Sequence, residues 1–387
     1  MQAYRGCMDL LSALEDIEKR TSSTIGVTDT SPFPQEEHRL VDRVSGGLHG
    51  GLAFTYARPE IAARPARSFP WASSIVAAAV PYLRDGDGEA DGRTVARFAD
   101  GDRYGDLRAV LEEIDAALRV GGNRTEIVWD DRRLIDRAVA VRAGIAWPGK
   151  STMVLTPGTG PWILLGSVVT DAVLPVSAPM RRTCGTCDEC IPACPTDAIV
   201  SAGVLDARRC ISAVLQRRGT IDMKLREAIG GRIYGCDECL TACPPGRSSL
   251  RARSAGTAVF SPEQVLMASD EDLEPFVEHW YVPSRRMRFV RRNALVALGN
   301  TGDESSLELL AGYLGGEDAL LACHAAWAIG RIGGAPASAI CAAALESETD
   351  ESIIHELRCA IDASDRGGVY ADVLSAPQPF DLEETPR

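Results

Sequence analysis

The sequence predicts three parts that differ in fold class: an α/β domain over residues 1–178, an α+β domain over 179–250 and an all-α domain over 262–365. Three observations support this division. Strand-like and helical segments alternate in the first part, cysteines concentrate in the second, and a helical pattern repeats in the third. The polar, proline-containing end of the chain, residues 366–387, is expected to be a disordered tail.

Alternating segments define the first part. Short apolar runs bounded by glycine, proline or charge are typical of buried strands, and longer runs with apolar residues three and four apart are typical of helices. We expect a helix over 106–119 and strands over 73–83, 126–129, 151–156 and 162–170. This alternation predicts an α/β domain.

Composition and targeting signals limit the class of protein. The 387 residues are 45% hydrophobic and 25% charged, which is ordinary for a globular chain. No run of 18 uncharged apolar residues occurs, so no membrane span is predicted. The first twenty residues are typical of an amphipathic helix with acidic positions, unlike a secretion signal. We therefore expect a cytoplasmic protein.

The cysteine-rich part is typical of iron–sulfur binding. The run Cys184-x2-Cys187-x2-Cys190-x3-Cys194-Pro195 is the spacing of bacterial ferredoxins, in which the fourth thiolate binds the other cluster of a pair. A complementary half follows in Cys210 and Cys236-x2-Cys239-x3-Cys243-Pro244. We therefore predict a two-cluster ferredoxin-like domain, with one [4Fe–4S] cluster on Cys184, Cys187, Cys190 and Cys243 and a second on Cys194, Cys210, Cys236 and Cys239.

Zinc is the alternative occupant of a cysteine-rich segment. Structural zinc sites use four ligands in two separated pairs, whereas this chain has a run of three with a crossing fourth. Iron–sulfur clusters fit the spacing better. The other four cysteines, which are isolated in the sequence, are interpreted as small buried apolar residues: Cys7, Cys323, Cys341 and Cys359.

The third part contains an internal repeat. Residues 293–303 and 324–334 align at an offset of 31, so that Ala294 matches Ala325 and Gly299 matches Gly330. Small residues at helix-packing positions, followed by a glycine-ended turn, predict stacked helix pairs of the HEAT type. Such arrays present surfaces and rarely catalyse.

The net charge of −13 argues against a nucleic-acid partner, but the basic residues are clustered. Nearly all of them are arginine, and five lie close together at Arg285, Arg286, Arg288, Arg291 and Arg292. Such a run is typical either of a phosphate-binding face or of an ordinary solvated helix face. Charge alone leaves both interpretations open.

Several segments together resemble the epoxyqueuosine reductases. They are VWDDRRLIDRAVAVRAGIAWPGK at 128–150, WILLGSVVTDAVLP at 162–175, ARRCIS followed by GRIYGCDECLTACP, and RRMRFVRRNALVALGN near residue 290. The resemblance implies a cobalamin-binding catalytic domain over 1–178, a two-cluster domain over 179–250 and HEAT-like repeats after them. It also implies reduction of epoxyqueuosine to queuosine in tRNA by a cobalamin centre that the clusters supply with electrons. The implied partners are tRNA and an external low-potential donor of flavodoxin or ferredoxin type, with the enzyme itself a monomer.

The resemblance also assigns roles to residues. It places the proton donor at Asp130, and it implies contacts to the corrinoid from Ser212, Asp237, Arg58, Tyr104 and Ser151. From the residues alone, Asp130 or its neighbour Asp131 would be interpreted as a helix N-cap. None of the five histidines lies in a lower-ligand motif, so a cobalt without a histidine ligand fits the sequence.

The chain departs from the family pattern at Gly105, Ala146 and Ser167, where the family often has histidine, glycine and glutamate. Two alternative functions therefore accompany the main one. The first is a corrinoid and iron–sulfur reductase of another substrate, like the reductive dehalogenases. The second is a non-catalytic iron–sulfur electron carrier with a scaffold domain.

Overall fold

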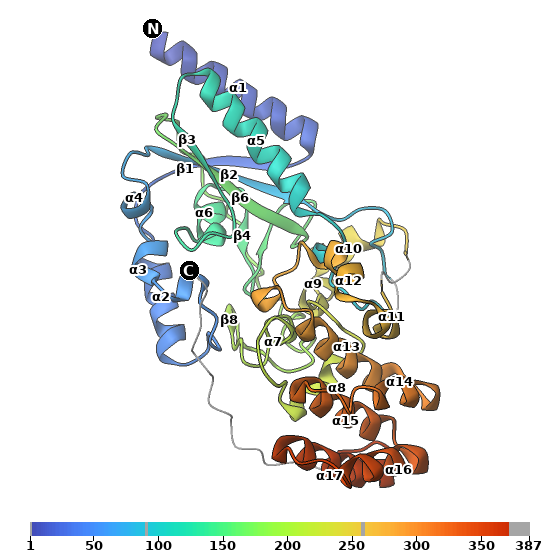
Figure 1. The fold of residues 1–387 in the computed structure, drawn as a ribbon. Helices are drawn as coiled ribbons and strands as arrows, with labels where there is room; N and C mark the ends of the chain where they lie inside the picture. Colours follow the sequence, from blue (N-terminus) through green and yellow to red (C-terminus); the bar gives the residue numbers. More distant parts are fainter. Residues whose placement is uncertain (1, 90–91, 257–259, 371–387) are drawn as a thin grey trace. The chain divides into compact units, whose positions relative to one another are not determined.

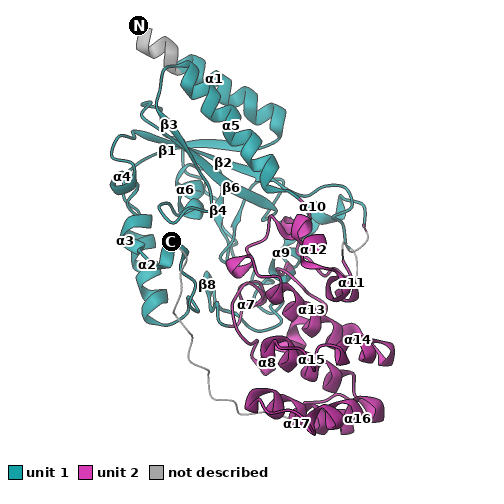
Figure 2. Ribbon diagram, in the orientation of Figure 1, with its two compact units in different colours: residues 1–89, 102–208, 238–255 teal, residues 90–101, 209–237, 256–387 magenta. Residues whose placement is uncertain are grey.

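The computed structural model describes residues 2–89, 92–256 and 260–370, so most of the segment expected to be a disordered tail lies outside the described residues. Its contacts divide the chain into two compact units (Figure 2). Unit 1 comprises residues 1–89, 102–208 and 238–255, and unit 2 comprises 90–101, 209–237 and 256–387. Among the described residues, no helix has the length and apolar character needed to cross a membrane.

A four-stranded antiparallel sheet forms the centre of unit 1. Its strand order is β1 (Thr24–Asp29), β2 (Ser74–Pro81), β6 (Ile163–Thr170) and β3 (Thr125–Val128). The middle strands are apolar and nearly completely buried, because both faces of the sheet are covered.

Helices pack on the two faces of this sheet (Figure 1). On one face lies α5 (Tyr104–Val120), with α1 (Gln2–Thr21) beside it. Close packing there depends on Gly166, since a Cβ atom at this position would approach Leu111 of α5 to 2.6 Å. On the other face lies α6 (Asp136–Arg142), which packs on alternate residues of β2 such as Ile75 and Ala77.

The observed sheet refines the sequence prediction. Unit 1 combines helices and strands as expected of an α/β domain, but every strand pair in its main sheet is antiparallel, an arrangement that parallel βαβ units would not give. The prediction missed β1, whose sequence TIGVTD is short and partly polar. The strand expected over 151–156 was wrong in extent, because Thr152 adopts a left-handed φ of +73° and the strand β5 covers Val154–Leu155, paired with Trp147–Pro148 (β4).

The remaining elements of unit 1 are short. Three helices connect β1 to β2: α2 (Pro34–Ser45), α3 (Pro59–Ala62) and α4 (Pro65–Ser68). The cysteine-rich segment adds the hairpin β7 (Ile199–Ser201) and β8 (Val204–Leu205), then α9 (Glu238–Thr241) and α10 (Pro244–Arg251). The buried Trp162 donates its indole N–H to the carbonyl oxygen of Gly246 at 2.8 Å, which fixes α10 to the start of β6.

Unit 2 is helical. It begins with α7 (Ile211–Leu215) and α8 (Met223–Ile229) and continues with α11 (Pro262–Met267), α12 (Asp270–Val277), α13 (Arg288–Thr301), α14 (Leu307–Ala311), α15 (Ala319–Ile332), α16 (Gly334–Leu345) and α17 (Glu351–Asp365). The helices α13, α15 and α17 pack side by side. The aligned glycines lie at these contacts: a Cβ atom at Gly299 would approach the Cα of Ala328 to 2.7 Å, and one at Gly330 would approach the Cα of Ala360 to 2.6 Å. Small repeat residues therefore set the helix spacing, as predicted.

Candidate cluster and active site

Four thiols of unit 1 lie together in the cysteine-rich segment. The chain turns tightly there, with the N–H of Cys187 donating to the carbonyl of Cys184 at 3.0 Å. Burial raises the pKa of the Cys190 thiol, and the nearby charges of Cys184, Cys243 and Cys187 raise that pKa further. The structure thus brings together the four residues that the spacing assigns to the first cluster. Burial also raises the pKa of the Cys243 thiol, and thiols such as Cys190 and Cys243 would ionise more readily beside a cation, which cluster iron would supply.

The residues assigned to the second cluster are distributed over both units. Cys194 and Cys239 belong to unit 1, and Cys210 and Cys236 belong to unit 2. In unit 1, the Cys194 sulfur accepts a hydrogen bond from the N–H of Ala198 at 3.2 Å, the kind of contact that stabilises a ligating thiolate. None of the eight assigned cysteines, all of which lie in the described ranges, forms a disulfide bond. Within the described ranges, no group of three or more His, Cys, Asp or Glu side chains is arranged for a single metal ion.

The segment after β3 holds the predicted proton donor. Asp130 is exposed and has a φ of +46°, a left-handed conformation that costs energy for a residue with a Cβ atom. Its neighbour Asp131 accepts hydrogen bonds from the backbone and the guanidinium of Arg133. Partial burial would raise the pKa of Asp131, but its bonds to Arg133 hold that pKa below the usual range. Neither aspartate caps α6, whose N-cap residue is Ile135, so the N-cap interpretation was wrong.

A second carboxyl group, not singled out in the sequence, lies against this segment. Asp136 is the first residue of α6, and its carboxyl group lies close enough to the Asp130 segment for that segment to influence its pKa. Its Oδ1 atom is shielded from solvent and has no hydrogen-bond partner among the described residues. Burial raises the pKa of Asp136 well above the ordinary range, and the charge of Asp130 raises it further. Neither helical nor strand spacing predicts this proximity, because the chain between Asp130 and Asp136 is irregular.

The turn that contains Ser151 contacts the same helix. Arg137 of α6 donates to the carbonyl of Thr152 at 3.2 Å, and Ser151 accepts from the N–H of Met153 at 3.4 Å. The carbonyl of Lys150 accepts from the N–H of Gly203 in the β7–β8 hairpin at 2.8 Å. This turn therefore joins the Asp130 segment to the cysteine-rich segment within unit 1.

The other predicted corrinoid contacts in unit 1 lie on separate elements. Arg58 is the N-cap residue of α3, with an exposed side chain 3.9 Å from Glu60, and Tyr104 is the first residue of α5. At Gly105 the N–H donates to the Asp102 carboxylate at 2.6 Å, and a Cβ atom would approach that carboxylate to 2.5 Å. A histidine at this position would therefore displace Asp102.

The departure at Ser167 lies close to the Asp130 segment. Ser167 is buried on β6 and pairs with Val128, the last residue of β3. The third departure, Ala146, is also buried, just before β4. Two of the three departures are thus buried near the segments that the family resemblance identifies as catalytic, and they change polarity and volume there.

In unit 2, Asp237 is held in a buried ion pair. It accepts hydrogen bonds from the backbone N–H of Arg97 at 2.9 Å and from its guanidinium at 3.2 Å. Burial raises the pKa of Asp237 even though Arg97 opposes this shift. The Oδ1 atom is shielded and has no hydrogen-bond partner in the part of the chain that the structure describes, so it can accept a hydrogen bond from a ligand. Ser212, on α7, accepts from the Gln216 side chain at 3.3 Å.

The arginine run of unit 2 does not form a continuous basic face. Arg292 is fully buried, donates to the carbonyls of Arg217 and Gly219, and has a pKa that burial lowers to about 9. Arg288 and Arg291 pair with aspartates. Only Arg285 and Arg286 are exposed, so the phosphate-binding interpretation of the whole run was wrong for Arg292, which stabilises the helical core.

Comparison with known proteins identifies the family. A model described as a 4Fe-4S double cluster binding domain matches residues 183–246, and a PBS lyase HEAT-like repeat matches 290–316. An epoxyqueuosine reductase of Bacillus cereus is 31% identical over 360 residues, which cover 87% of this chain and 93% of the relative. The chain belongs to the epoxyqueuosine reductase family. It is accordingly an oxidoreductase.

Solved structures of epoxyqueuosine reductases support the same assignment. One, in complex with an epoxyqueuosine-modified stem loop of tyrosine tRNA, has a TM-score of 0.81 and 30% identity and covers 94% of this chain and 100% of its own. Another, from Bacillus subtilis, has an aspartate-bearing catalytic loop swung out of the active site. It has a TM-score of 0.81 and 30% identity, with coverage of 93% and 99%.

Proposed function

We propose that this chain reduces epoxyqueuosine to queuosine at the wobble position of tRNA. The observation that carries the proposal is the likeness, over 94% of the chain, to an epoxyqueuosine reductase solved with its modified stem loop. Removal of the epoxide oxygen as water takes two electrons and two protons. The chain must therefore supply a path for electrons and a proton donor beside the epoxide.

The electron path would use two [4Fe–4S] clusters in the 179–250 segment. Cys184, Cys187, Cys190 and Cys243 would hold the first, and Cys194, Cys210, Cys236 and Cys239 the second. Bound cobalamin would supply a strongly reducing cobalt centre. Asp237, with its shielded and unpartnered oxygen, is the best-supported contact for that cofactor. Ser212, Arg58, Tyr104 and Ser151 are further proposed contacts, and the 1–178 segment would form most of the catalytic domain.

Asp130 is the proposed proton donor. Its side chain is exposed, its backbone is left-handed, and the buried carboxyl group of Asp136 lies close by. Strained, exposed side chains of this kind are common at active sites. Because Asp136 favours its protonated form, it limits the negative charge that accumulates beside Asp130.

The tRNA would be bound in part by the HEAT-like segment, 262–365. The exposed arginines of unit 2 include Arg285, Arg286 and Arg218, and Arg218 donates to Ser284 at 2.6 Å in the same exposed turn. Arginine guanidinium groups suit phosphate. Charge reversal at Arg285 and Arg286 should weaken tRNA binding and reduce its salt dependence, whereas reversal at Arg366, an exposed residue paired with Asp362 on α17, should not.

Mass spectrometry of tRNA nucleosides tests the function directly. Protein reconstituted with iron, sulfide and cobalamin is reduced with dithionite and incubated with epoxyqueuosine-containing tRNA. Conversion to queuosine supports the proposal. If the loaded protein binds the tRNA but leaves the epoxide intact, the proposal fails. Reductase activity on another substrate then better explains the departures from the family pattern at Gly105 and Ser167.

A further inference from the structure

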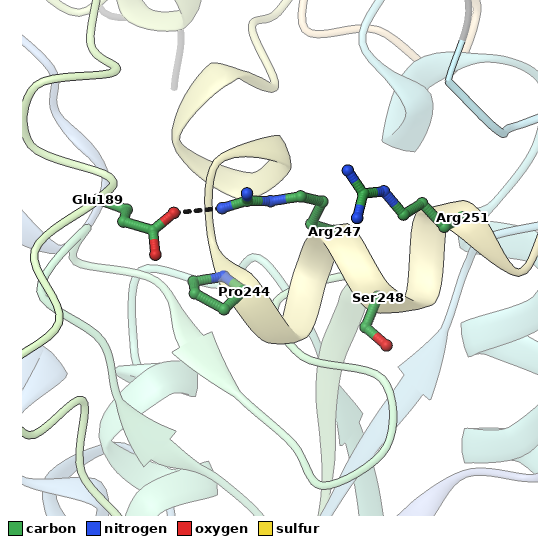
Figure 3. Close-up of a pocket in the computed structure, with 5 residues that line it drawn as sticks. All are labelled: Glu189, Pro244, Arg247, Ser248 and Arg251. Carbon is green, nitrogen blue, oxygen red and sulfur yellow. Dashed lines mark hydrogen bonds and ion pairs between the residues drawn. The ribbon is translucent and has the colours of Figure 1, made fainter.

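A polar pocket lies beside the four thiols assigned to the first cluster. It has a volume of about 320 Å³ and belongs entirely to unit 1 (Figure 3). Its lining residues are Glu189, Pro244, Arg247, Ser248 and Arg251. The resemblance and the proposed chemistry assign no role to this pocket.

Both walls of the pocket are continuous with assigned cluster ligands. Glu189 immediately precedes Cys190, and Pro244 immediately follows Cys243, the N-cap residue of α10. The other lining residues follow Pro244 along α10 at helical spacing, so they lie on one face of that helix. Anything that binds in this pocket therefore lies against the backbone that would hold the first cluster.

Arginines dominate the charge around the pocket. Arg247 pairs with Glu189 and also donates to the carbonyl of Ala242 at 2.8 Å, so it is held in place. The Arg251 side chain is 66% exposed, and its nearest carboxylate, on Glu89, lies 3.5 Å away. Such exposed ion pairs contribute little to stability, so Arg251 can readily pair with a carboxylate of a partner protein instead.

The neighbouring sequence adds to this positive charge. Residues 181–190 and 244–253 contain five arginines, namely Arg181, Arg182, Arg247, Arg251 and Arg253, against two acids, Asp188 and Glu189. Arg253 has a carboxylate, on Asp85, 3.7 Å away. Glu89 and Asp85, which lie near Arg251 and Arg253, bring the acids to four, so this region carries a small positive excess on a chain whose net charge is −13. Charge complementarity of this kind steers an oppositely charged protein to one surface.

We propose that this pocket is the docking site for an acidic one-electron carrier protein, whose surface carboxylates pair with Arg251 and Arg247. The inference rests on the proposed function, since it concerns the entry of electrons into the first cluster. Each encounter oxidises the carrier by one electron and reduces the cluster by one, and it needs no proton. Phosphate groups of RNA would also suit the arginines, but RNA delivers no electrons, and the position beside Cys190 and Cys243 favours the carrier.

Stopped-flow reduction under anaerobic conditions tests the proposal. Reduced flavodoxin is the probe, and bleaching of cluster absorbance is the signal. Arg251→Glu should raise the half-saturating flavodoxin concentration about tenfold and reduce the salt dependence of the rate. Glu189→Gln should lower the half-saturating flavodoxin concentration, because this substitution removes a carboxylate that competes with the carrier for Arg247. Dithionite, which needs no docking surface, should reduce both variants at the wild-type rate.

A matched control is Arg39→Glu, which reverses another exposed arginine of unit 1, paired with Glu36 on α2 and well separated from α10 in Figure 2. It should leave flavodoxin kinetics unchanged. An unchanged half-saturation in Arg251→Glu, or an equal loss with dithionite, would overturn the proposal. Weakened tRNA binding with normal flavodoxin kinetics would also overturn it, and would make the pocket a phosphate site. Failure of the proposed function would look different: flavodoxin would still reduce the clusters, but no queuosine would form.

Discussion

Arg226 and Glu356 form a buried ion pair with two hydrogen bonds, of 3.1 and 2.7 Å, across 130 residues of chain. Arg226 comes from α8, in the insertion between Cys210 and Cys236, and Glu356 comes from α17, the last repeat helix. The Arg226 guanidinium also lies over the Trp327 ring of α15, with 5.8 Å to its centroid. The insertion is thereby attached to two repeat helices, which explains how it is held within unit 2.

Removal of one partner of this ion pair should be costly. Glu356→Ala leaves a buried guanidinium without its counter-charge, and we expect a loss of about 3–5 kcal/mol in the unfolding free energy of unit 2. Replacement of both partners, as in Arg226→Met with Glu356→Leu, should recover most of that loss. Urea unfolding followed by tryptophan fluorescence measures both changes. Equal losses in the single and double variants would contradict this account.

The proposed role of Asp130 predicts a specific defect. Asp130→Asn should lower epoxyqueuosine turnover by about 10²- to 10⁴-fold, because the amide cannot donate the proton. Cluster absorbance and tRNA affinity should be unchanged. The matched control is Asp131→Asn, in the same segment, which loses its ion pair with Arg133 but should retain turnover. Normal turnover in Asp130→Asn would remove the assigned role.

Asp136 should make stability depend on pH in a defined direction. Its raised pKa means that the folded chain holds a proton that the unfolded chain releases, so this group's contribution to stability is present in acid. That contribution is lost as pH rises from about 4, the usual range of aspartate, through the raised pKa of the folded state. Asp136→Asn cannot titrate. Relative to wild type, it should therefore gain stability at neutral pH and show no gain below about pH 4. Thermal unfolding across pH checks this; a constant difference would refute it.

The repeat glycines should tolerate no side chain. Gly299→Ala places a Cβ atom 2.7 Å from the Cα of Ala328, and because backbone cannot move aside easily, we expect a loss of about 1–3 kcal/mol despite the better helix propensity of alanine. Gly315→Ala is the control, since nothing lies within 4 Å of its Cβ position. Denaturant midpoints compare the two variants. An unchanged denaturant midpoint in Gly299→Ala would mean that α13 and α15 can move apart to make room for the added methyl group.

The proposed ligands predict selective loss of iron. Cys243→Ala should remove the first cluster and reduce iron content and visible absorbance by about half. The control is Cys341→Ala, which removes a fully buried thiol of unit 2 that is not assigned as a ligand. This variant should keep the full iron content. Iron analysis and electron paramagnetic resonance of the reduced protein distinguish these results. Full iron in Cys243→Ala would exclude that cysteine as a ligand.

Elements with strong local patterns were predictable from the sequence. The helix expected at 106–119 is observed as Tyr104–Val120, and the strand expected at 162–170 as Ile163–Thr170. The spacing of Cys184, Cys187 and Cys190 likewise predicted that these three thiols lie close together. In each case, the pattern lies in residues close together in the chain, so periodicity or spacing is sufficient.

Features that depend on distant contacts were not predictable. Arg292 was interpreted as a surface charge, yet backbone carbonyls of a segment more than seventy residues earlier accept its hydrogen bonds. The contribution of Arg97 to the Asp237 site spans 140 residues and carries no local signature. Thr152 shortened the start of a predicted strand because of its left-handed backbone, a conformation that threonine rarely adopts.

The interleaving of the two units has a consequence for synthesis of the protein. Unit 1 includes residues 238–255, which follow a long segment of unit 2, and unit 2 includes residues 90–101 from early in the chain. Neither unit is complete when its first segments leave the ribosome. The N-terminal sheet must wait for α10, to which Trp162 bonds, before its last packing partners arrive. A fragment that ends before residue 238 lacks the last segment of unit 1, so we expect it to stay incompletely folded and to be bound by chaperones or degraded. A fragment that ends after residue 255 contains every segment of unit 1.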